Sequence, residues 1–213
     1  MESFLAQYRG RKPLHRRGCW KVIEHLLGEG AIADLAGFRE LLAEYSQPIR
    51  RVIYNNEGLL SYRSVPNSKR CRIEDWETSC FFLANYDGHY ASSRLLVEAM
   101  LQTPGYRSGN CKASFQTAGA GIPRHCDDVD VISIQLFGQR TWALEPNIDP
   151  PIGIDDPVVL PTRRRRGWSA DFGDRVEQHV NGPGSVLYVP RGWWHETRSH
   201  DPSFALILAL KPA

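Results

Sequence analysis

The sequence predicts a mainly β protein with an α-helical flank at its N-terminus. After residue 110, short runs rich in β-branched and aromatic residues alternate with glycine and proline, as in a small barrel or sandwich. The first 45 residues instead carry apolar side chains at helical spacing. A chain of 213 residues can enclose one hydrophobic core. We therefore expect one domain over 1–213, with the flank and outer strands in 1–109 and the β core in 110–213.

Three helices and three strands are expected before the core. The helices are placed at residues 20–27, 34–45 and 92–101, where glycine or a Thr-Pro-Gly sequence ends the first and the last. Two strands at 49–54 and 59–62 flank a turn at 55–58, and a further strand is expected at 79–84.

The core is expected to contain seven strands. They are placed at 111–117, 129–137, 140–144, 158–160, 176–180, 185–189 and 203–210. Residues 119–124 are expected to form a turn that delivers the following residues to the mouth of the barrel. The turn and apolar strand within 182–190 should leave His195 just past a strand end.

Composition excludes some classes of protein and favours a cytoplasmic one. The net charge of +2 is too small to indicate binding to nucleic acid or to an anionic membrane. No apolar run approaches the roughly 18 residues of a membrane span, and the N-terminus lacks the apolar centre of a secretory signal. The five cysteines include no CxxC pair, which favours reduced thiols.

Two histidines and an aspartate are the candidate metal ligands. His125 and Asp127 are two positions apart, so on a strand both side chains would point to the same side. His195 follows a turn and an apolar strand. Each half is weak alone, because HxD triplets arise by accident and His195 would also suit a tryptophan-rich core. Together they match the facial triad that binds non-haem Fe(II) and leaves coordination positions open.

Three motifs in order resemble the JmjC-type oxygenases. They are His125-x-Asp127-x-x-Asp130-Val131, Gln135-x-x-Gly138-x-Arg140-x-Trp142 and Leu187-Tyr-Val-Pro-Arg-Gly-Trp-Trp-His195. The resemblance covers residues 80–210 and extends to the cupin-like bacterial branch that includes the ribosomal oxygenases. It implies a double-stranded β-helix, also called a cupin or JmjC-like jelly roll. It further implies Fe(II) held by the triad, 2-oxoglutarate as co-substrate and O2 as oxidant.

The same resemblance assigns a co-substrate site. A basic residue thirteen positions after the motif's aspartate pairs with the far carboxylate of 2-oxoglutarate in that family, and here this residue is Arg140. A guanidinium suits a two-pronged carboxylate contact, and with the triad present this role is favoured over that of an exposed strand arginine. Ser114 and Gln116 share a strand face and are candidates for further contact with the co-substrate; barrel packing is the alternative for both.

The resemblance implies hydroxylation of an amino-acid side chain, expected within a peptide or protein rather than in a free amino acid, with release of succinate and CO2. Ribosomal oxygenases carry further regions after the barrel, whereas this sequence ends at Pro212-Ala213. One alternative is an RNA-modifying oxygenase in which Arg163–Arg166 contacts phosphates, although a solvated loop is the simpler reading of that run. Another is a metal-binding cupin that is not an oxygenase. The oligomeric state is left open.

Overall fold

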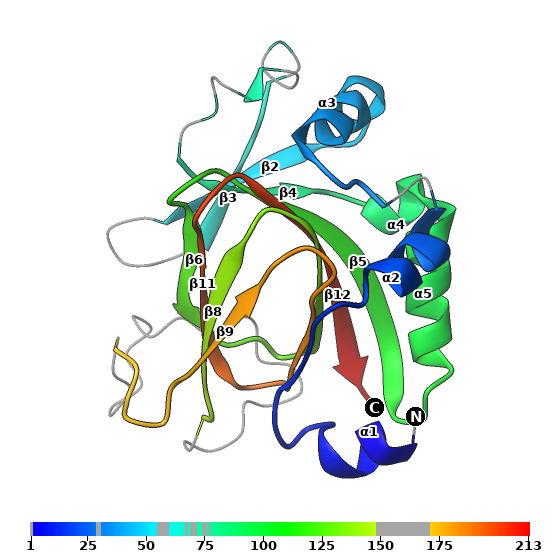
Figure 1. The fold of residues 1–213 in the computed structure, drawn as a ribbon, viewed down its shortest axis with the longest axis vertical. Coiled ribbons are helices and arrows are strands. Elements are labelled where there is room, and N and C mark those ends of the chain that lie inside the picture. The colour runs from blue at the N-terminus through cyan, green and yellow to red at the C-terminus, as the bar shows by residue number, and fades with distance from the viewer. Residues whose placement is uncertain are drawn as a thin grey trace.

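The computed structural model describes residues 2–28, 31–54, 60–66, 68, 72–73, 76, 78–147 and 171–213. Two β sheets face each other in this part of the chain, and helices lie beside the larger sheet (Figure 1). The helices are α1 (Glu2–Gln7), α2 (Trp20–Leu27), α3 (Leu35–Glu44), α4 (Tyr86–His89) and α5 (Ala91–Leu101). The strands are β1 (Leu14–Arg16), β2 (Ile49–Tyr54), β3 (Leu60–Ser64), β4 (Cys80–Leu83), β5 (Tyr106–Gln116), β6 (Gly121–His125), β7 (Asp130–Phe137), β8 (Arg140–Glu145), β9 (Glu177–Asn181), β10 (Val186–Val189), β11 (Trp194–Ser199) and β12 (Ser203–Pro212).

The larger sheet has the strand order β1-β10-β7-β12-β5-β4-β2-β3, and the smaller sheet has the order β6-β11-β8-β9. All of their strand pairs are antiparallel. The expected mainly β fold with an α-helical N-terminal flank is confirmed. The long central pair of β5 and β12 spans the larger sheet, so the two faces of these strands decide what lies on each side of it.

Alternation along β5 separates a helix-covered core from an inner cavity. Phe115 is fully buried and stacks on Phe38 of α3, with ring centroids 4.4 Å apart. Phe204 of β12 packs against the same ring at 4.9 Å. Burying a phenylalanine stabilises a fold by about 2 kcal/mol, so this cluster fixes the flank on the sheet. The opposite face of β5 carries Asn110, Lys112, Ser114 and Gln116, which line the cavity between the sheets.

Helix α3 begins where the sequence predicts it. The Asp34 side chain accepts a hydrogen bond from the Gly37 backbone N–H at 2.8 Å, which satisfies one of the free donors of the first turn. Phe38, Leu41 and Leu42 form the buried face of the helix, as the apolar spacing indicates. The flank therefore packs through one apolar stripe.

Two strands of the smaller sheet, β6 and β11, were not expected. Residues 119–124 were predicted as a turn, but Gly121–His125 form β6. Pro123 obscures this strand because proline cannot donate to a ladder; β6 tolerates it as the edge of its sheet. His195 was expected past a strand end, but it lies inside β11, whose polar sequence lacks an apolar pattern. Asp127 was placed on a strand with His125, whereas it lies in the loop after β6.

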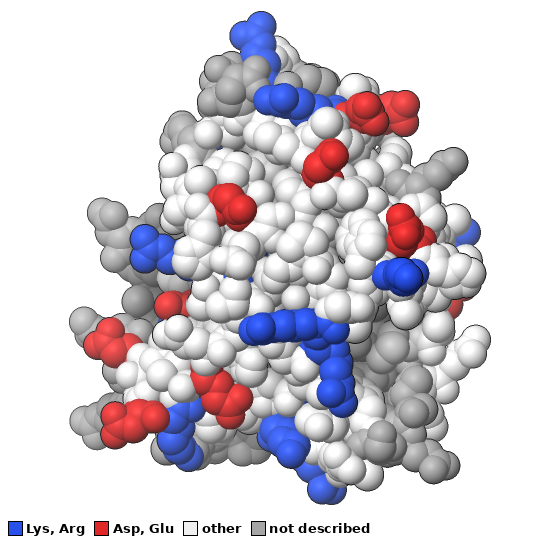
Figure 2. Space-filling view, in the orientation of Figure 1, with Lys and Arg blue, Asp and Glu red and all other residues white. Residues whose placement is uncertain are grey.

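Three predictions fall outside the described residues: the turn at 55–58, the strand at 158–160 and the Arg163–Arg166 run. Within the described chain, none of the helices has the length and apolar character needed to cross a bilayer. Cationic and anionic side chains both occur on the face drawn in Figure 2, in keeping with the net charge of +2.

Candidate metal and co-substrate site

The three candidate ligands meet at one end of the smaller sheet. His125 ends β6, and His195 is its direct cross-strand partner on β11. Their ring centroids are 4.1 Å apart. The Oδ2 atom of Asp127 lies 4.0 Å from Nε2 of His125 and 3.5 Å from Nε2 of His195. The ligand atoms of all three residues lie within 4.8 Å of one another, so one ion can contact all of them.

Backbone carbonyls orient both imidazoles toward this shared point. Nδ1 of His125 lies 2.8 Å from the carbonyl oxygen of Pro123, and Nδ1 of His195 lies 3.0 Å from that of Trp193. A carbonyl oxygen can only accept, so each Nδ1 carries the proton and donates it. Each Nε2 then keeps its lone pair for a metal ion, which is the arrangement that ligating histidines need.

The protonation states also suit a cation. Burial, with the second imidazole His195 beside it, lowers the pKa of His125 from 6.5 to about 4. His125 is therefore neutral near pH 7. Burial alone would raise the pKa of Asp127, but its contact with His195 and the neighbouring His125 hold it below its ordinary value. The carboxylate of Asp127 and the neutral imidazole of His125 thus face the same point.

Asp130 joins the two loops that carry the ligands. Its Oδ1 accepts from the Arg191 backbone N–H at 2.7 Å, and its Oδ2 accepts from the hydroxyls of Tyr106 at 2.8 Å and Tyr188 at 3.0 Å. The Gly192 N–H donates to the Asp127 carbonyl at 3.0 Å. These contacts tie the loop after β6 to the turn before His195, so both carboxylate oxygens of Asp130 are used in holding the two loops together.

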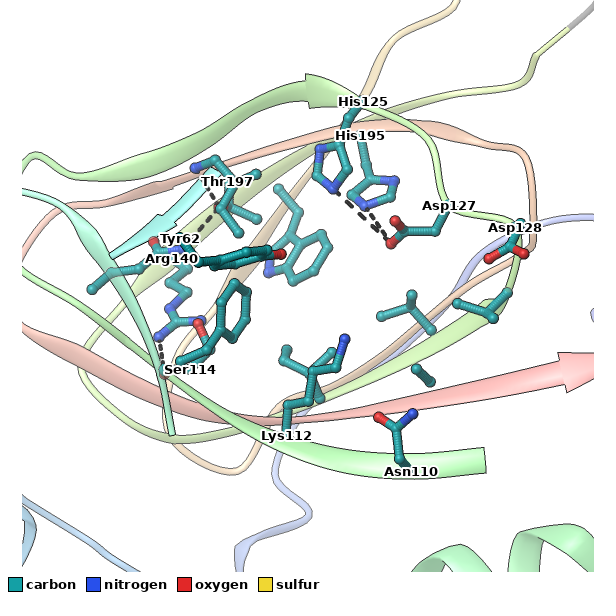
Figure 3. A pocket seen from close by; sticks show the side chains of 18 residues that line it. Tyr62, Asn110, Lys112, Ser114, His125, Asp127, Asp128, Arg140, His195 and Thr197 are labelled. Atoms are coloured by element: carbon teal, nitrogen blue, oxygen red, sulfur yellow. Dashed lines mark hydrogen bonds and ion pairs between the residues drawn. The ribbon is translucent and has the colours of Figure 1, made fainter. Parts of the chain in front are cut away.

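A cavity of about 300 Å³ extends from the triad between the two sheets (Figure 3). Arg140, Ser114 and Thr197 lie at the end away from the metal ligands. The Trp142 ring forms part of the wall and lies nearly parallel to His195, with centroids 5.8 Å apart. The cavity therefore has a metal end and a deep end, joined by apolar walls.

Arg140 is buried at the deep end, with 1% of its surface exposed, so it is not an exposed strand arginine. Its Nε donates to Ser203 Oγ at 2.8 Å, and its Nη1 donates to Ser114 Oγ at 3.1 Å. Its Nη2 donates to the carbonyls of Ser114 at 2.6 Å and Ser203 at 2.9 Å. Among the described residues, these bonds leave one Nη1 hydrogen free. Most of the guanidinium fork is therefore engaged by neighbouring residues, and one N–H and the positive charge remain to interact with a ligand.

Gln116 is fully buried and supports the deep end through other side chains. Its Nε2 donates to Thr197 Oγ1 at 3.0 Å, and its Oε1 accepts from Ser199 Oγ at 2.8 Å. Thr197 Oγ1 also accepts from the Ile122 N–H at 3.1 Å, so its own hydroxyl hydrogen remains available to a ligand. Ser114 and Gln116 both line the cavity with Arg140. The amide group of Gln116, however, is hydrogen-bonded to Thr197 and Ser199.

Sequence reasoning missed several residues that line the cavity, among them Tyr62, Lys112, Trp142 and Thr197. Lys112 is two positions before Ser114 on the same strand face, so the alternation that identified Ser114 would also have found it. Thr197 was hidden because β11 itself was not predicted. Tyr62 reaches the cavity from β3, which is an edge strand of the larger sheet. No local sequence pattern indicates this placement.

Together, the two facing sheets and the triad define the class of protein. The site is a metal-binding site of the two-histidine, one-carboxylate type inside a jelly roll, with an arginine at the far end of the same cavity. The JmjC domain family matches residues 96–212, more than half of the chain. The chain belongs to this family, and its fold is the double-stranded β-helix that the motifs predict.

Relatives include ribosomal oxygenases. The chain is 25% identical to the uncharacterized protein YxbC of Bacillus subtilis, over 97% of this chain and 66% of that protein. It is 24% identical to the ribosomal protein uL16 3-hydroxylase of Escherichia coli, over 76% of this chain and 40% of that protein. The chain thus spans less than two thirds of these relatives. A crystal structure of E. coli YcfD matches all of this chain and 53% of its own, at 18% identity and a TM-score of 0.69.

Proposed function

We propose that this chain is an Fe(II)- and 2-oxoglutarate-dependent dioxygenase that hydroxylates an amino-acid side chain, most simply within a peptide or protein. The observation that carries the proposal is the placement of His125, Asp127 and His195 at one end of a cavity whose other end holds Arg140. A 2-oxo diacid needs these two features together: a cation for its keto-acid end and a cation for its far carboxylate.

The residues fit the ion on the chemistry of their donors. Two imidazole nitrogens with free lone pairs and one carboxylate are the set that suits non-haem Fe(II) with open positions. The carbonyls of Pro123 and Trp193 hold the two rings in the required tautomer. When bound, the ion and the 2-oxo acid supply oxygen activation coupled to decarboxylation, which yields succinate and CO2.

The remaining residues of the cavity bind the far carboxylate of the 2-oxo acid and exclude water. Arg140 contributes its charge and one N–H to the far carboxylate, and the free hydroxyl hydrogen of Thr197 supplies a second donor. Trp142 keeps water away from the space between the two ends. Oxygenases among the relatives support the assignment: one is named ribosomal oxygenase 1, from Rattus norvegicus, at 32% identity over 42% of this chain and 14% of that protein. A solved structure of YcfD contains cobalt and 2-oxoglutarate.

The substrate side of the proposal is a peptide or protein. The E. coli relative is named for hydroxylation of a ribosomal protein. At the end of the cavity near the triad, Asn110 is exposed and Asp128 is half-buried, whereas Arg140 at the other end is buried, so we infer that a side chain enters beside the triad while its backbone stays outside. We take residues 1–213 as one oxygenase domain in which β5 and β12 carry the wall opposite the triad.

Anaerobic titration of the purified chain with Fe(II) and 2-oxoglutarate tests the proposal. We expect a weak visible metal-to-ligand absorption band, followed by succinate release when oxygen is admitted. Asp127→Ala should abolish the band. Asp128→Ala is the matched control, since this adjacent carboxylate pairs with Lys211 at 2.7 Å and should leave the band in place.

Two results would contradict the proposal. A wild-type chain that gives no band and no succinate is not a 2-oxoglutarate oxygenase. A band that survives in both aspartate variants would show that the ion binds elsewhere. Product formation without oxygen or 2-oxoglutarate would instead favour the metal-binding cupin of another activity.

A further inference from the structure

Lys112 is a cation in the cavity to which neither the metal end nor the deep end gives a role. It projects from β5 into the cavity, toward the side that carries the triad (Figure 3). Its register partner on β12 is Ile207, and both residues line the cavity. Its aliphatic stem therefore runs along an apolar wall while its ammonium group reaches the open space.

No described residue gives the Lys112 ammonium group a hydrogen bond or an ion pair. The carboxylate of Asp128 lines the same mouth, but Lys211 already occupies it at 2.7 Å. Asp127 feels the charge of Lys112, which is one of the causes that lower its pKa. Asp127 is nevertheless committed to the metal ion in the proposed enzyme. The ammonium group thus remains without a counter-charge in the loaded site.

The charge balance of the loaded site makes this cation significant. A dication and Arg140 contribute three positive charges, and Asp127 and a 2-oxo diacid contribute three negative ones. The machinery is therefore neutral without Lys112. The charge of Lys112 is left over, beside the space into which the substrate must come to reach the metal. An anionic group entering there would be attracted, and a cationic one repelled.

We propose, building on the oxygenase function above, that Lys112 determines specificity by pairing with a carboxylate on the substrate. The entering group is an acidic side chain of a peptide, or the main-chain carboxylate of a free amino acid. A lysine, arginine or protonated histidine side chain is disfavoured. Lys112 acts on the substrate and not on 2-oxoglutarate, whose far carboxylate is held at the opposite end by Arg140 and Thr197.

Binding is read from the anaerobic band, because a substrate that enters beside the metal perturbs the absorption of the chelate. The probes are peptides of the form Gly-Gly-Xaa-Gly-Gly with blocked termini, in which Xaa is Asp, Glu, Asn, Gln or Lys. Free aspartate and free asparagine form a second arm. In the wild type we expect an acidic Xaa to perturb the band at roughly tenfold lower concentration than its amide, the usual size of a charge-assisted hydrogen bond. A response to both free amino acids without one to the peptides would assign the carboxylate to the main chain.

Three variants isolate the residue. Lys112→Met keeps the apolar stem and should remove the preference for acid over amide, while 2-oxoglutarate produces the band at unchanged concentration. Lys112→Glu should shift the preference toward the lysine peptide. Lys21→Met, on the exposed face of α2, is the matched control and should behave as wild type. Circular dichroism and thermal unfolding verify that each variant is folded.

The outcomes separate the two proposals. An equal response to acidic and neutral probes in the wild type, or no response to any of them, overturns the role of Lys112 although the band itself upholds the oxygenase. A Lys112→Met variant that needs at least tenfold more 2-oxoglutarate overturns it too, since Lys112 would then serve the co-substrate. Absence of the band in the wild type is a failure of the oxygenase proposal itself.

Discussion

The metal end and the deep end of the cavity are built in opposite ways. At the metal end, the backbone holds the back of each imidazole, and the Nε2 atoms of His125 and His195 face only Asp127. At the deep end, the polar groups of Arg140 and Gln116 are mostly paired with serine and threonine neighbours. The metal end thus directs donor atoms toward a point where an ion can bind, whereas the deep end uses most of its polar atoms in internal hydrogen bonds.

This difference implies different costs of mutation. A substitution at the metal end removes a ligand without removing a packed network, so it should affect chemistry and leave the fold intact. A substitution at the deep end breaks several internal hydrogen bonds at once, so it should affect stability and co-substrate affinity together. Four predictions test this contrast.

The largest effect is expected for His195→Ala at the metal end. Loss of one of three ligands should lower turnover by about a thousandfold or more, because the ion no longer binds in the required geometry. The unfolding free energy of the metal-free protein should change by much less than for a deep-end variant. Succinate release and urea unfolding measure the two quantities. If His195→Ala lost its turnover because the protein was unfolded, the two ends of the cavity would not differ in the way proposed.

Arg140→Met should combine both effects at the deep end. The change removes four hydrogen bonds to Ser114 and Ser203, so we expect about 3 kcal/mol less stability toward unfolding. The affinity for 2-oxoglutarate should fall as well. Arg140→Lys, which restores the charge but not the network, should recover part of the affinity and little of the stability. If wild type, Arg140→Met and Arg140→Lys were equally stable in urea, the hydrogen bonds of Arg140 would not contribute to stability as proposed.

Acidification should weaken the metal-free fold through His125. The unfolded chain takes up a proton at this imidazole near pH 6.5, while the folded chain resists protonation down to about pH 4. Stability is therefore lost as the pH falls through that window, by about 2 kcal/mol between pH 7 and pH 5. His125→Asn, which cannot titrate, should flatten this part of the profile. Urea unfolding at both pH values makes the comparison; parallel profiles for wild type and variant would rule out His125 as the cause.

The smallest effect is expected for Thr197→Val, which keeps the shape and removes the hydroxyl. The Gln116 amide and the Ile122 N–H then lose an acceptor, and the far carboxylate loses a donor. We expect about 1 kcal/mol less stability and a several-fold higher KM for 2-oxoglutarate, with Fe(II) affinity unchanged. Thr141→Val, on the neighbouring strand but absent from the residues that line the cavity, is the control. A change in Fe(II) affinity alone would place Thr197 in the metal end instead.

Sequence patterns were informative where the information is local. The alternation of Cys111, Ala113 and Phe115 with Lys112 and Ser114 marks β5 as a strand with two different faces, and the structure has it so. The spacing of the helical flank likewise predicts the buried stripe of α3. Strands β6 and β11, in contrast, were not predicted from local sequence patterns. One contains a proline and the other is polar, and both form because their partners in the smaller sheet complete their hydrogen bonds.

The sequence by itself determined the identity of the three candidate ligands, the basic residue thirteen positions after Asp127, and the mainly β class. Only the tertiary structure decided that His125 and His195, seventy positions apart, become cross-strand neighbours, and that Thr197 and Tyr62 share a cavity with Lys112. The reason is physical. Residue type and spacing encode chemistry and local periodicity, whereas strand pairing across long loops is fixed by the burial of the whole core.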